Sequence, residues 1–291
     1  MSGPAADTKN VSRTRSALAL VLTGAALMLV VSLAKDNPAA GSGTGVTIWA
    51  VGDGADGSEA SKALARRITS SGADRFLYLG DVYQDGTAAE FKSSYESVYG
   101  ALAPVTSPTP GNHEWPLQRN GYTPYWSRKK GRPQPSWYSF RTAGWQVVSM
   151  NSETAHDSRS PQVRWLRRAV SGTGDCRIAF WHRPRYSAGT SHGDNPDLEP
   201  FWRALEGRAS IVLNGHEHNL QRFRQRRGIH EFVSGAGGHK PHGLRPDARL
   251  AFGNDDDRGA LRLRLRPGVA EFAFVAADGR VLDSGRVPCR R

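Results

Sequence analysis

Apolar, β-branched runs alternate with amphipathic stretches through the first two thirds of the chain. This alternation predicts strands at 46–51, 76–79, 145–150, 177–181 and 211–213, and helices at 58–69, 87–98, 161–170 and 196–205. After residue 219 only strands are expected, at 221–224, 229–233, 261–265, 269–275 and 281–287. The succession predicts an α/β domain with two sheets, helices outside and a β-rich C-terminal part.

The first 45 residues have the pattern of an export segment. Three basic residues precede an unbroken apolar and weakly polar run at 17–34, and a small-residue linker follows. The run reaches the low end of the length that spans a bilayer. We therefore expect residues 1–45 to be a signal peptide or a membrane anchor plus linker. Residues 46–291 should form one domain outside the cytoplasm, touching the membrane only through the N-terminal segment.

Composition and charge limit the classes of molecule that the chain is expected to bind. The chain has 291 residues, 38% of them hydrophobic, so it can bury a sizeable core. Its net charge of +12 suits attraction to phosphates, nucleic acid or anionic envelope polymers, or reflects a GC-rich genome that encodes arginine freely. The basic residues are scattered, without a basic amphipathic helix or aromatic platform, so no specific nucleic-acid partner is expected.

The two cysteines, Cys176 and Cys289, suggest one disulfide in a protein outside the cytoplasm. Two buried, unpaired thiols are the alternative. No CxxC spacing exists, which argues against a structural zinc site.

Side chains that bind metals follow the ends of the predicted strands. Because sites in α/β sheets form beyond the carboxyl ends of strands, five such loops should converge. A preceding glycine lets the backbone turn beside a metal. The blocks are Gly52-Asp53, Gly80-Asp81, Gly111-Asn112-His113-Glu114, His182 alone and Gly215-His216-Glu217-His218.

Carboxylate, amide and imidazole together suit Zn, Mn or Fe. On an extended segment His216 and His218 would face the same side, with Glu217 turned away. Any one block has an ordinary explanation, since an aspartate after glycine is usually a turn residue or a helix cap. Five blocks in this order predict a metal site.

These blocks closely resemble the calcineurin-like metallophosphoesterases, and among them the purple acid phosphatase branch with its bacterial secreted relatives. The resemblance covers about residues 46 to 288. It rests on GDGA at 52–55, GDVY at 80–83, GNHE at 111–114, His182 within FWHRP, GHEH at 215–218 and the glycine-rich EFVSGAGG at 231–238. It implies a metallophosphoesterase-type two-sheet β-sandwich flanked by helices, in αββα layers.

The resemblance also implies a role for each residue. Asp81 bridges two metal ions, either Fe with Zn or Mn, or two divalent ions such as Zn and Mn. Asp53 and His218 hold the first ion. Asn112, His182 and His216 hold the second. His113 lies over the substrate phosphate as the catalytic residue that protonates or steadies the leaving oxygen.

One position departs from the family pattern. Ala55 stands where many members have a histidine ligand to the first ion. The purple acid phosphatase branch recruits a tyrosine three residues after the bridging aspartate, but Tyr83 is two residues after Asp81. Either Tyr83 is a ligand, which favours Fe(III), or it is a packed aromatic and water completes the first ion.

Substrate contacts are predicted from Arg185 and His192, with Arg183 and His239 as further candidates; for each, a solvated loop residue is the alternative. His192 belongs to a polar loop at 187–194 that could form a rim or lid.

Three functions are compatible with these motifs. The first is a phosphomonoesterase of the acid-phosphatase type outside the cytoplasm. The second is a phosphodiesterase acting on nucleotides or envelope phosphodiesters. The third is a catalytically weak metal- or phosphate-binding protein, which the retained ligands disfavour. GxSxG, HExxH, P-loop and dinucleotide motifs are absent from the sequence.

Overall fold

The structure is a computed structural model that describes residues 45–289. Contacts divide the chain into residues 1–43 and residues 44–291, and the second unit contains all the helices and strands named here. The predicted signal or anchor lies outside the described residues. Among residues 45–289, no helix combines the length and apolar character needed to cross a membrane.

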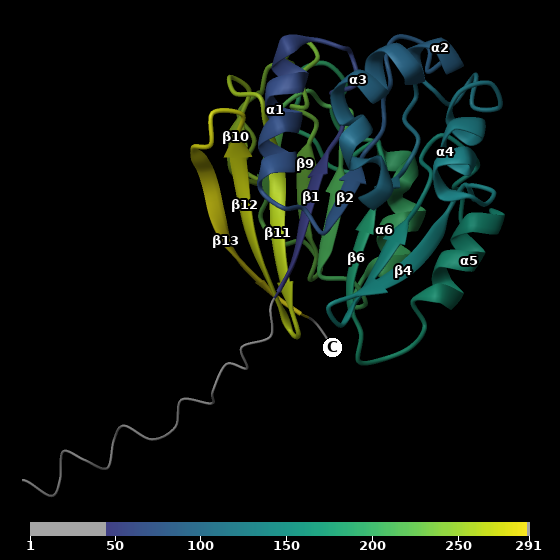
Figure 1. Cartoon of the computed structure of the whole chain (residues 1–291). Helices are drawn as coiled ribbons and strands as arrows, with labels where there is room; N and C mark the ends of the chain where they lie inside the picture. Colours follow the sequence, from purple (N-terminus) through teal and green to yellow (C-terminus); the bar gives the residue numbers. More distant parts are fainter. Residues whose placement is uncertain (1–44, 290–291) are drawn as a thin grey trace, which may run out of the picture. The chain divides into compact units, whose positions relative to one another are not determined.

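Two β-sheets form the centre of the domain (Figure 1). The six-stranded sheet has the order β13-β12-β11-β1-β2-β3, and the seven-stranded sheet has the order β10-β8-β9-β7-β6-β5-β4. The first comprises β1 (Val46–Val51), β2 (Arg75–Tyr78), β3 (Thr106–Pro108), β11 (Gly259–Arg266), β12 (Val269–Ala276) and β13 (Val281–Pro288). The second comprises β4 (Tyr138–Thr142), β5 (Trp145–Ser149), β6 (Cys176–Phe180), β7 (Ile211–Asn214), β8 (Leu220–Phe223), β9 (His230–Ser234) and β10 (Leu250–Asn254).

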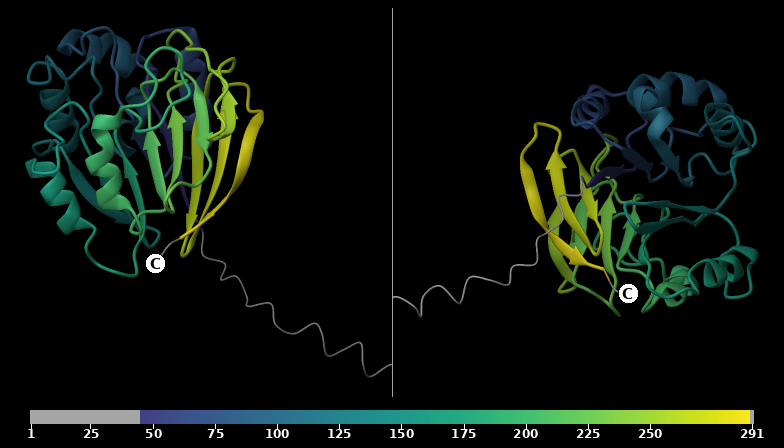
Figure 2. Two further views of the ribbon diagram at one scale, coloured as in Figure 1. Left: turned by 180° about the vertical axis from the view of Figure 1, so that it is seen from behind. Right: turned by 60° about the horizontal axis from the view of Figure 1, so that its bottom comes forward.

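Helices cover both outer faces of the sandwich, as the two further views show (Figure 2). The six-stranded sheet packs against α1 (Glu59–Ser70), α3 (Glu96–Tyr99) and α4 (Tyr122–Lys130), whereas the short α2 (Ala88–Glu90) buries no residue. The seven-stranded sheet packs against α5 (Pro161–Ala169) and α6 (Glu199–Leu205). This arrangement confirms the predicted α/β architecture with αββα layers and a β-rich C-terminal part.

The central strands are buried on both faces, which explains their continuous apolar runs. In β1, Ile48 and Ala50 point into the space between the sheets, while Trp49 and Val51 pack against the helices. This alternation follows from the two-residue period of a strand. A strand fixed on both sides holds the loop that follows it in a defined place.

Five elements were not predicted: α4, the 3₁₀ helix Gly100–Val105 and the short strands β3, β4 and β10. Helix α4 shows little apolar periodicity, because it buries only Tyr122, Tyr125 and Trp126. The helix predicted at 87–98 is broken by a π-helical stretch, Phe91–Tyr95. The one predicted at 196–205 begins with a 3₁₀ turn, Pro196–Leu198.

A disulfide joins Cys176 to Cys289, with their Cα atoms 5.2 Å apart. Cys176 begins β6 of the seven-stranded sheet, and Cys289 follows β13 of the six-stranded sheet. The bond therefore ties the two sheets together. It lies at the amino end of β6, whereas His182 lies just beyond the carboxyl end of that strand.

Candidate metal centre

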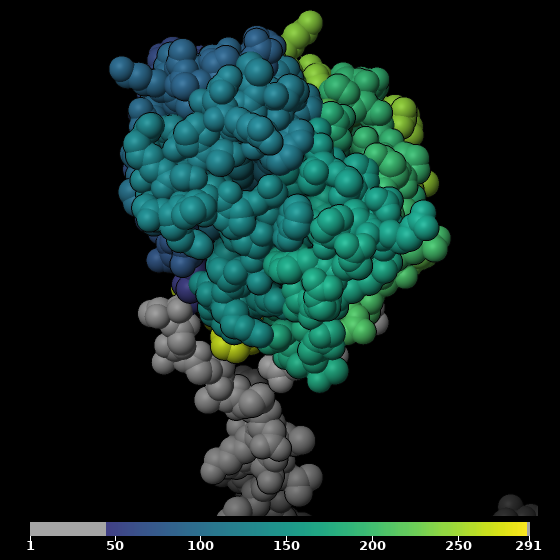
Figure 3. Space-filling view, turned by 90° about the vertical axis from the view of Figure 1, so that its right-hand side faces the viewer, coloured from purple at the N-terminus to yellow at the C-terminus, as the bar shows by residue number. Residues whose placement is uncertain are grey.

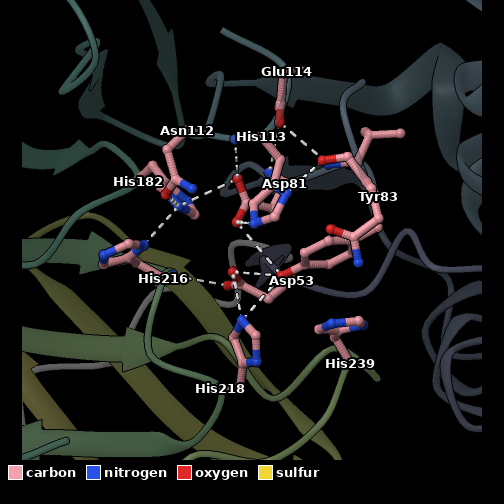
Figure 4. A network of polar contacts seen from close by, with 12 residues as sticks. Asp53, Asp81, Tyr83, Asn112, His113, Glu114, His182, His216, His218 and His239 are labelled. Atoms are coloured by element: carbon pink, nitrogen blue, oxygen red, sulfur yellow. Dashed lines mark hydrogen bonds and ion pairs between the residues drawn. The ribbon is translucent and has the colours of Figure 1, made fainter. Parts of the chain in front are cut away.

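The five predicted blocks meet at one end of the sandwich (Figure 4). Strands β1, β2 and β3 run parallel to one another in one sheet, as do β6 and β7 in the other, so their carboxyl ends share an edge. Backbone contacts lock the loops to one another. The Asp53 amide donates to the Gly80 carbonyl at 3.0 Å, and the His216 amide donates to Asp53 Oδ2 at 2.8 Å. Ligand-type side chains from both sheets therefore share one site.

One group of donors surrounds His182 Nε2. Asp81 Oδ1 lies 3.4 Å from this atom, and Asn112 Oδ1 and His216 Nδ1 each lie 3.1 Å from it. Ligand atoms of Asp81, His182 and His216 all fall within 4.8 Å of one another, the separation expected of groups that can share an ion. These are the four side chains that the resemblance assigns to the second ion.

A second group surrounds the phenol oxygen of Tyr83. This oxygen lies 3.0 Å from His218 Nε2, 3.3 Å from Asp53 Oδ1 and 3.4 Å from Asp81 Oδ2. Asp81 thus presents Oδ2 to this group and Oδ1 to the other. Of the two alternatives for Tyr83, the geometry favours the ligand over the packed aromatic.

The backbone at the site is bent in a way that the sequence pattern did not indicate. Asp53, Asp81 and His216 all have positive φ, at 60°, 69° and 71°. Such values are uncommon for residues with side chains and are found at functional sites. The prediction that residues 216–218 are extended was wrong. The two histidines converge because the chain turns at His216, and Glu217 is directed away from the donors.

The glycines in the blocks are required mainly by close approach. A Cβ on Gly111 would lie 2.1 Å from Asp81 Oδ1, and one on Gly215 would lie 2.7 Å from Asp53 Oδ2. Gly235, from the glycine-rich segment after β9, is equally confined, since its Cβ would come within 2.8 Å of Asp53 Oδ2. Any side chain at these positions would displace a carboxylate.

Hydrogen bonds hold two histidines in the tautomer that a metal ligand needs. His182 Nδ1 donates to the Leu79 carbonyl at 2.8 Å, and His218 Nδ1 donates to the Lys240 carbonyl at 2.6 Å. A carbonyl can only accept, so each Nε2 is left to face the donor groups. Ligand histidines are commonly fixed in this way.

The electrostatics of the site also favour a cation. Burial raises the pKa of Asp53 well above its usual range. Burial opposes a charge on His182, but the Asp81 and Asp53 carboxylates outweigh it and raise the pKa of His182 to about 10. A proton is therefore held where the carboxylates demand positive charge. Burial and the charge on His182 lower the pKa of His216. Burial and His242 lower the pKa of His218 to about 3. Both imidazoles are therefore neutral, as metal ligands must be. The donor set fits a pair of metal ions.

A second layer of polar residues supports the ligands. Glu217 is fully buried, and its Oε1 accepts from the amides of His192 and Gly193, each at 2.8 Å. Its Oε2 lies 3.2 Å from His242 Nδ1. His192 stacks on His216 with ring centres 4.0 Å apart, and His242 stacks on His218 at 3.7 Å. One buried carboxylate thus places an imidazole against each of the two ligands in GHEH.

Supporting contacts also flank Asp81 and Tyr83. Glu114 Oε2 accepts from the amides of Asp81 and Val82, both at 3.1 Å, which holds the turn after β2. His239 stacks on Tyr83 with ring centres 3.9 Å apart and lies 3.4 Å from Asp56 Oδ2. Each contact restricts a proposed ligand to one position.

A cavity of about 210 Å³ opens over the donors. Eight of its nine lining residues were predicted to bind metal, to act in catalysis or to contact substrate. His242 was not singled out; its one signal was a further histidine in the GHKPH sequence. Asp53 and His182 lie beneath the floor, fully buried. The lining residues are Asp81, Tyr83, Asn112, His113, His192, His216, His218, His239 and His242.

The two predicted arginines behave differently. Arg185 does not line this cavity; its Nε donates to Glu199 at 2.9 Å, and its guanidinium lies 4.4 Å from the centre of the Tyr186 ring. The structure therefore does not bring Arg185 to the site. Arg183 pairs with Glu153 at 3.0 Å, and its Nη1 lies 3.3 Å from His216 Nε2, at the edge of the donor group around His182.

Residues 46–220 match the model of the calcineurin-like phosphoesterase family. Tartrate-resistant acid phosphatase type 5 of Mus musculus is 24% identical over 273 residues, covering 79% of this chain and 83% of the relative. Purple acid phosphatase 15 of Arabidopsis thaliana is 30% identical over 129 residues, covering 38% of this chain and 24% of the relative. Probable purple acid phosphatase 20 of the same plant is 24% identical, covering 57% and 44%. The chain thus spans less than half the length of these two plant relatives.

Two solved structures share the fold. Purple acid phosphatase PPD1 of yellow lupin, Lupinus luteus, superposes with a TM-score of 0.70 at 18% identity, covering 84% of this chain and 53% of that one. GAP50 of Plasmodium, described as the anchor in the inner membrane complex, superposes with a TM-score of 0.71 at 15% identity, covering 86% and 90%.

Proposed function

The chain belongs to the calcineurin-like phosphoesterase family, and from this premise we propose that it is a dinuclear metal-dependent phosphatase that hydrolyses phosphate monoesters outside the cytoplasm. One observation carries the proposal. The Asp81 carboxylate faces two separate donor groups with its two oxygens, Oδ1 toward His182 and Oδ2 toward Tyr83. A carboxylate shared in this way is the natural bridge between two ions.

Seven side chains would hold the ions. Asp53, Asp81, Tyr83 and His218 form one set, and Asp81, Asn112, His182 and His216 form the other. When bound, such ions neutralise charge on the transferring phosphoryl group and acidify a water molecule to supply the nucleophile. A phenolate among the donors favours Fe(III) at the first position, with Zn or Mn at the second; two divalent ions are the alternative pair.

His113 is placed to serve the leaving group. Its Nδ1 faces the Gln84 carbonyl, which can only accept, so Nδ1 donates there. Nε2 is then directed to the cavity, 3.8 Å from Asp81 Oδ2. When protonated, Nε2 can donate to the leaving oxygen, which is the role of a general acid.

The cavity wall supports a monoester substrate. Besides the donors, the lining contains four imidazoles, from His113, His192, His239 and His242, and Asp81 is its only carboxylate. A phosphate monoester carries more negative charge than a diester at the same pH. Imidazole N–H groups donate hydrogen bonds, and a monoester presents three non-ester oxygens to them where a diester presents two.

A paired assay tests this proposal. The purified full chain is given p-nitrophenyl phosphate and bis-p-nitrophenyl phosphate, and metal content is measured on the same sample. We expect the monoester to be hydrolysed with the higher kcat/KM, by a protein that holds two metal ions. A higher kcat/KM for the diester would replace the proposal with the phosphodiesterase alternative. If Asn112→Ala left activity and metal content unchanged, the dinuclear site itself would be wrong.

Two features support an extracytoplasmic location. The apolar run at 17–34 has the pattern of an export segment, and a disulfide such as Cys176–Cys289 persists in oxidising compartments. Fractionation of cells that produce the full chain, with thiol alkylation before lysis, tests the location. We expect the protein outside the cytoplasm without an alkylatable thiol. A cytoplasmic protein with two reactive thiols would contradict this.

A further inference from the structure

A second cavity opens between the edges of the two sheets, away from the metal centre. Strand β3 ends the six-stranded sheet, and β4 ends the seven-stranded sheet. The Tyr138 hydroxyl of β4 donates to the Pro108 carbonyl of β3 at 2.8 Å, so the two edges are linked at the base of the cavity. The side of the domain that carries α4 and β4 faces the viewer in Figure 3. None of the residues that line this cavity belongs to the donor groups.

Three cations surround this cavity. Arg75 enters from the start of β2, Lys130 from the end of α4, and Arg132 from the loop that follows. The other lining residues are Pro104, Thr106, Ser107, Pro108, Gln134, Pro135, Tyr138, Ser139 and Phe140. None of the twelve is acidic, so the positive charge is not balanced within the cavity.

The three cations also lack carboxylate partners among residues 45–289. Elsewhere in the domain arginines pair with acids, as Arg222 does with Asp283 at 2.6 Å and Arg249 with Asp194 at 2.7 Å. At this cavity, by contrast, the Arg75 guanidinium lies over the Phe140 ring at 5.2 Å, and Lys130 Nζ donates to the Ala103 carbonyl at 3.1 Å. Both contacts leave the charges in place.

Lys130 is repelled by the other two cations of the cavity. Partial burial, followed by repulsion from Arg75 and Arg132, lowers the pKa of Lys130. A surface that gathers three such charges gains free energy when an anion enters. Since a single carboxylate would offset only one of them, the charge favours an anion that carries several negative charges.

The size and the donors of the cavity fit the same kind of anion. Its volume is about 350 Å³, larger than the cavity over the metal donors and within the usual range of ligand sites. Guanidinium forks match the oxygens of phosphate in pairs, and a lysine adds a point charge. Hydroxyl groups of Ser107 and Ser139 and the amide of Gln134 offer further hydrogen bonds.

We propose that this cationic pocket, lined by Arg75, Lys130 and Arg132 between the β3 and β4 edges, is a second anion site that binds phosphate groups. It is separate from the metal centre and does not depend on the proposed catalytic activity. The phosphate can be free inorganic phosphate or part of a phosphate chain, and the experiment distinguishes these two sources.

Hydrogen–deuterium exchange on the full chain tests this proposal, because the pocket and the metal centre fall in different peptides. Inorganic phosphate and tripolyphosphate are the two probes, with sodium chloride at matched ionic strength as the blank. We expect either probe at the pocket to slow exchange in segments 104–108 and 130–140. Slowing by inorganic phosphate identifies the free anion as sufficient, and slowing by tripolyphosphate alone identifies a chain.

Charge-neutral variants assign the effect to the pocket. The double variant Arg75→Gln with Arg132→Gln should need a probe concentration at least about tenfold higher than the unaltered chain for the same protection. A hydrogen bond to a charged group contributes that factor in affinity. Arg132 is exposed, so Arg132→Gln alone should keep the fold and shift binding in the same direction.

Arg66→Gln with Arg168→Gln removes equal charge from exposed helix positions and should behave as the unaltered chain. The proposal is overturned if neither segment is protected, if sodium chloride protects equally, or if the pocket variant and the unaltered chain respond alike.

Discussion

The phenol oxygen of Tyr83 lies 3.0 Å from Nε2 of His218, although Tyr83 follows Asp81 by only two residues. The turn after β2 makes this possible. Asp81 has a positive φ of 69°, and the Tyr83 amide donates to the Ala55 carbonyl at 3.0 Å. The ring is then held by stacking on His239. Many family members have a histidine ligand at the position of Ala55. In this chain, Tyr83, whose amide binds the Ala55 carbonyl, offers a phenol oxygen instead.

Tyr83→Phe removes that oxygen and keeps the ring. We expect the variant to lose up to one equivalent of metal and any visible absorption band from an iron–phenolate pair, because the donor group of Asp53, Asp81 and His218 then lacks its phenol. Metal analysis and absorption spectra of both proteins measure this. His239→Phe, which keeps an aromatic ring against Tyr83, is the matched control. An iron-loaded protein with no such band would show that Tyr83 is not a ligand.

His216→Ala removes one of the three side chains of the compact cluster formed by Asp81, His182 and His216. We expect kcat/KM to fall about 100-fold or more, because charge stabilisation worth several kcal/mol is lost. Metal content should fall with it. His230→Ala removes a histidine that does not line the metal cavity and should leave both quantities unchanged. Full activity in His216→Ala would contradict the assignment of the second ion.

The buried strands and their ligand blocks were predictable from sequence, because each block joins two independent signals. An apolar run marks the strand, and a glycine followed by a ligand-type side chain marks the loop beyond its end. Asp53, Asp81 and His216 follow this rule, whereas His182 comes directly after Trp181 and has the strand signal alone. Their convergence follows from the parallel strands alone, without knowledge of the loops.

Features that depend on contacts between distant segments were not predictable. His242 reaches the site from the loop after β9, and its contacts with Glu217 and with the His218 backbone place it against the His218 ring. Helix α4 was missed because few of its residues are buried. Arg185 was predicted to reach the site because it follows a ligand block, but Glu199 binds it elsewhere.

Glu217→Ala tests the buried carboxylate between the two ligands of GHEH. The change leaves the amides of His192 and Gly193 without their acceptor and removes the carboxylate beside His242 Nδ1. We expect kcat/KM to fall about 10- to 100-fold, the usual effect of losing a residue that supports metal ligands. Glu217→Gln keeps one acceptor oxygen and should lose less. Equal kinetics for Glu217→Ala and the unaltered chain would show that this support is unnecessary.

Removal of the disulfide should lower stability without lowering activity. The bond closes a loop of 113 residues, and losing a native disulfide typically costs about 2–5 kcal/mol. Because it lies at the end of β6 opposite His182, the variant Cys176→Ser with Cys289→Ser should hydrolyse substrate at the original rate at room temperature. Urea unfolding with and without reductant measures the effect. Reductant should destabilise the unaltered chain to the level of the variant, and a chain unaffected by reductant would contradict the expectation.

Glu231 gives a pH dependence that is separate from the metal centre. Its side chain is buried, its Oε1 accepts from the amides of Arg185 and Tyr186, and its Oε2 has no hydrogen-bond partner among the described residues. Burial raises the pKa of Glu231 to about 8. The folded protein therefore keeps a proton that the unfolded chain releases near pH 4.5. Stability from this group is present below that pH and is lost as the pH rises toward 8.

Glu231→Gln keeps the accepting oxygen and removes the ionisation. Relative to the unaltered chain, the variant should gain about 2–5 kcal/mol in free energy of unfolding between pH 4.5 and pH 8, since one pKa unit corresponds to about 1.4 kcal/mol. Urea unfolding at a series of pH values measures this difference. Glu271→Gln removes an acid from the surface ion pair with Arg286 and should show no such gain. If the difference between Glu231→Gln and the unaltered chain were the same at every pH, Glu231 would be ionised in the fold, and its unpaired oxygen would have to be stabilised by another group.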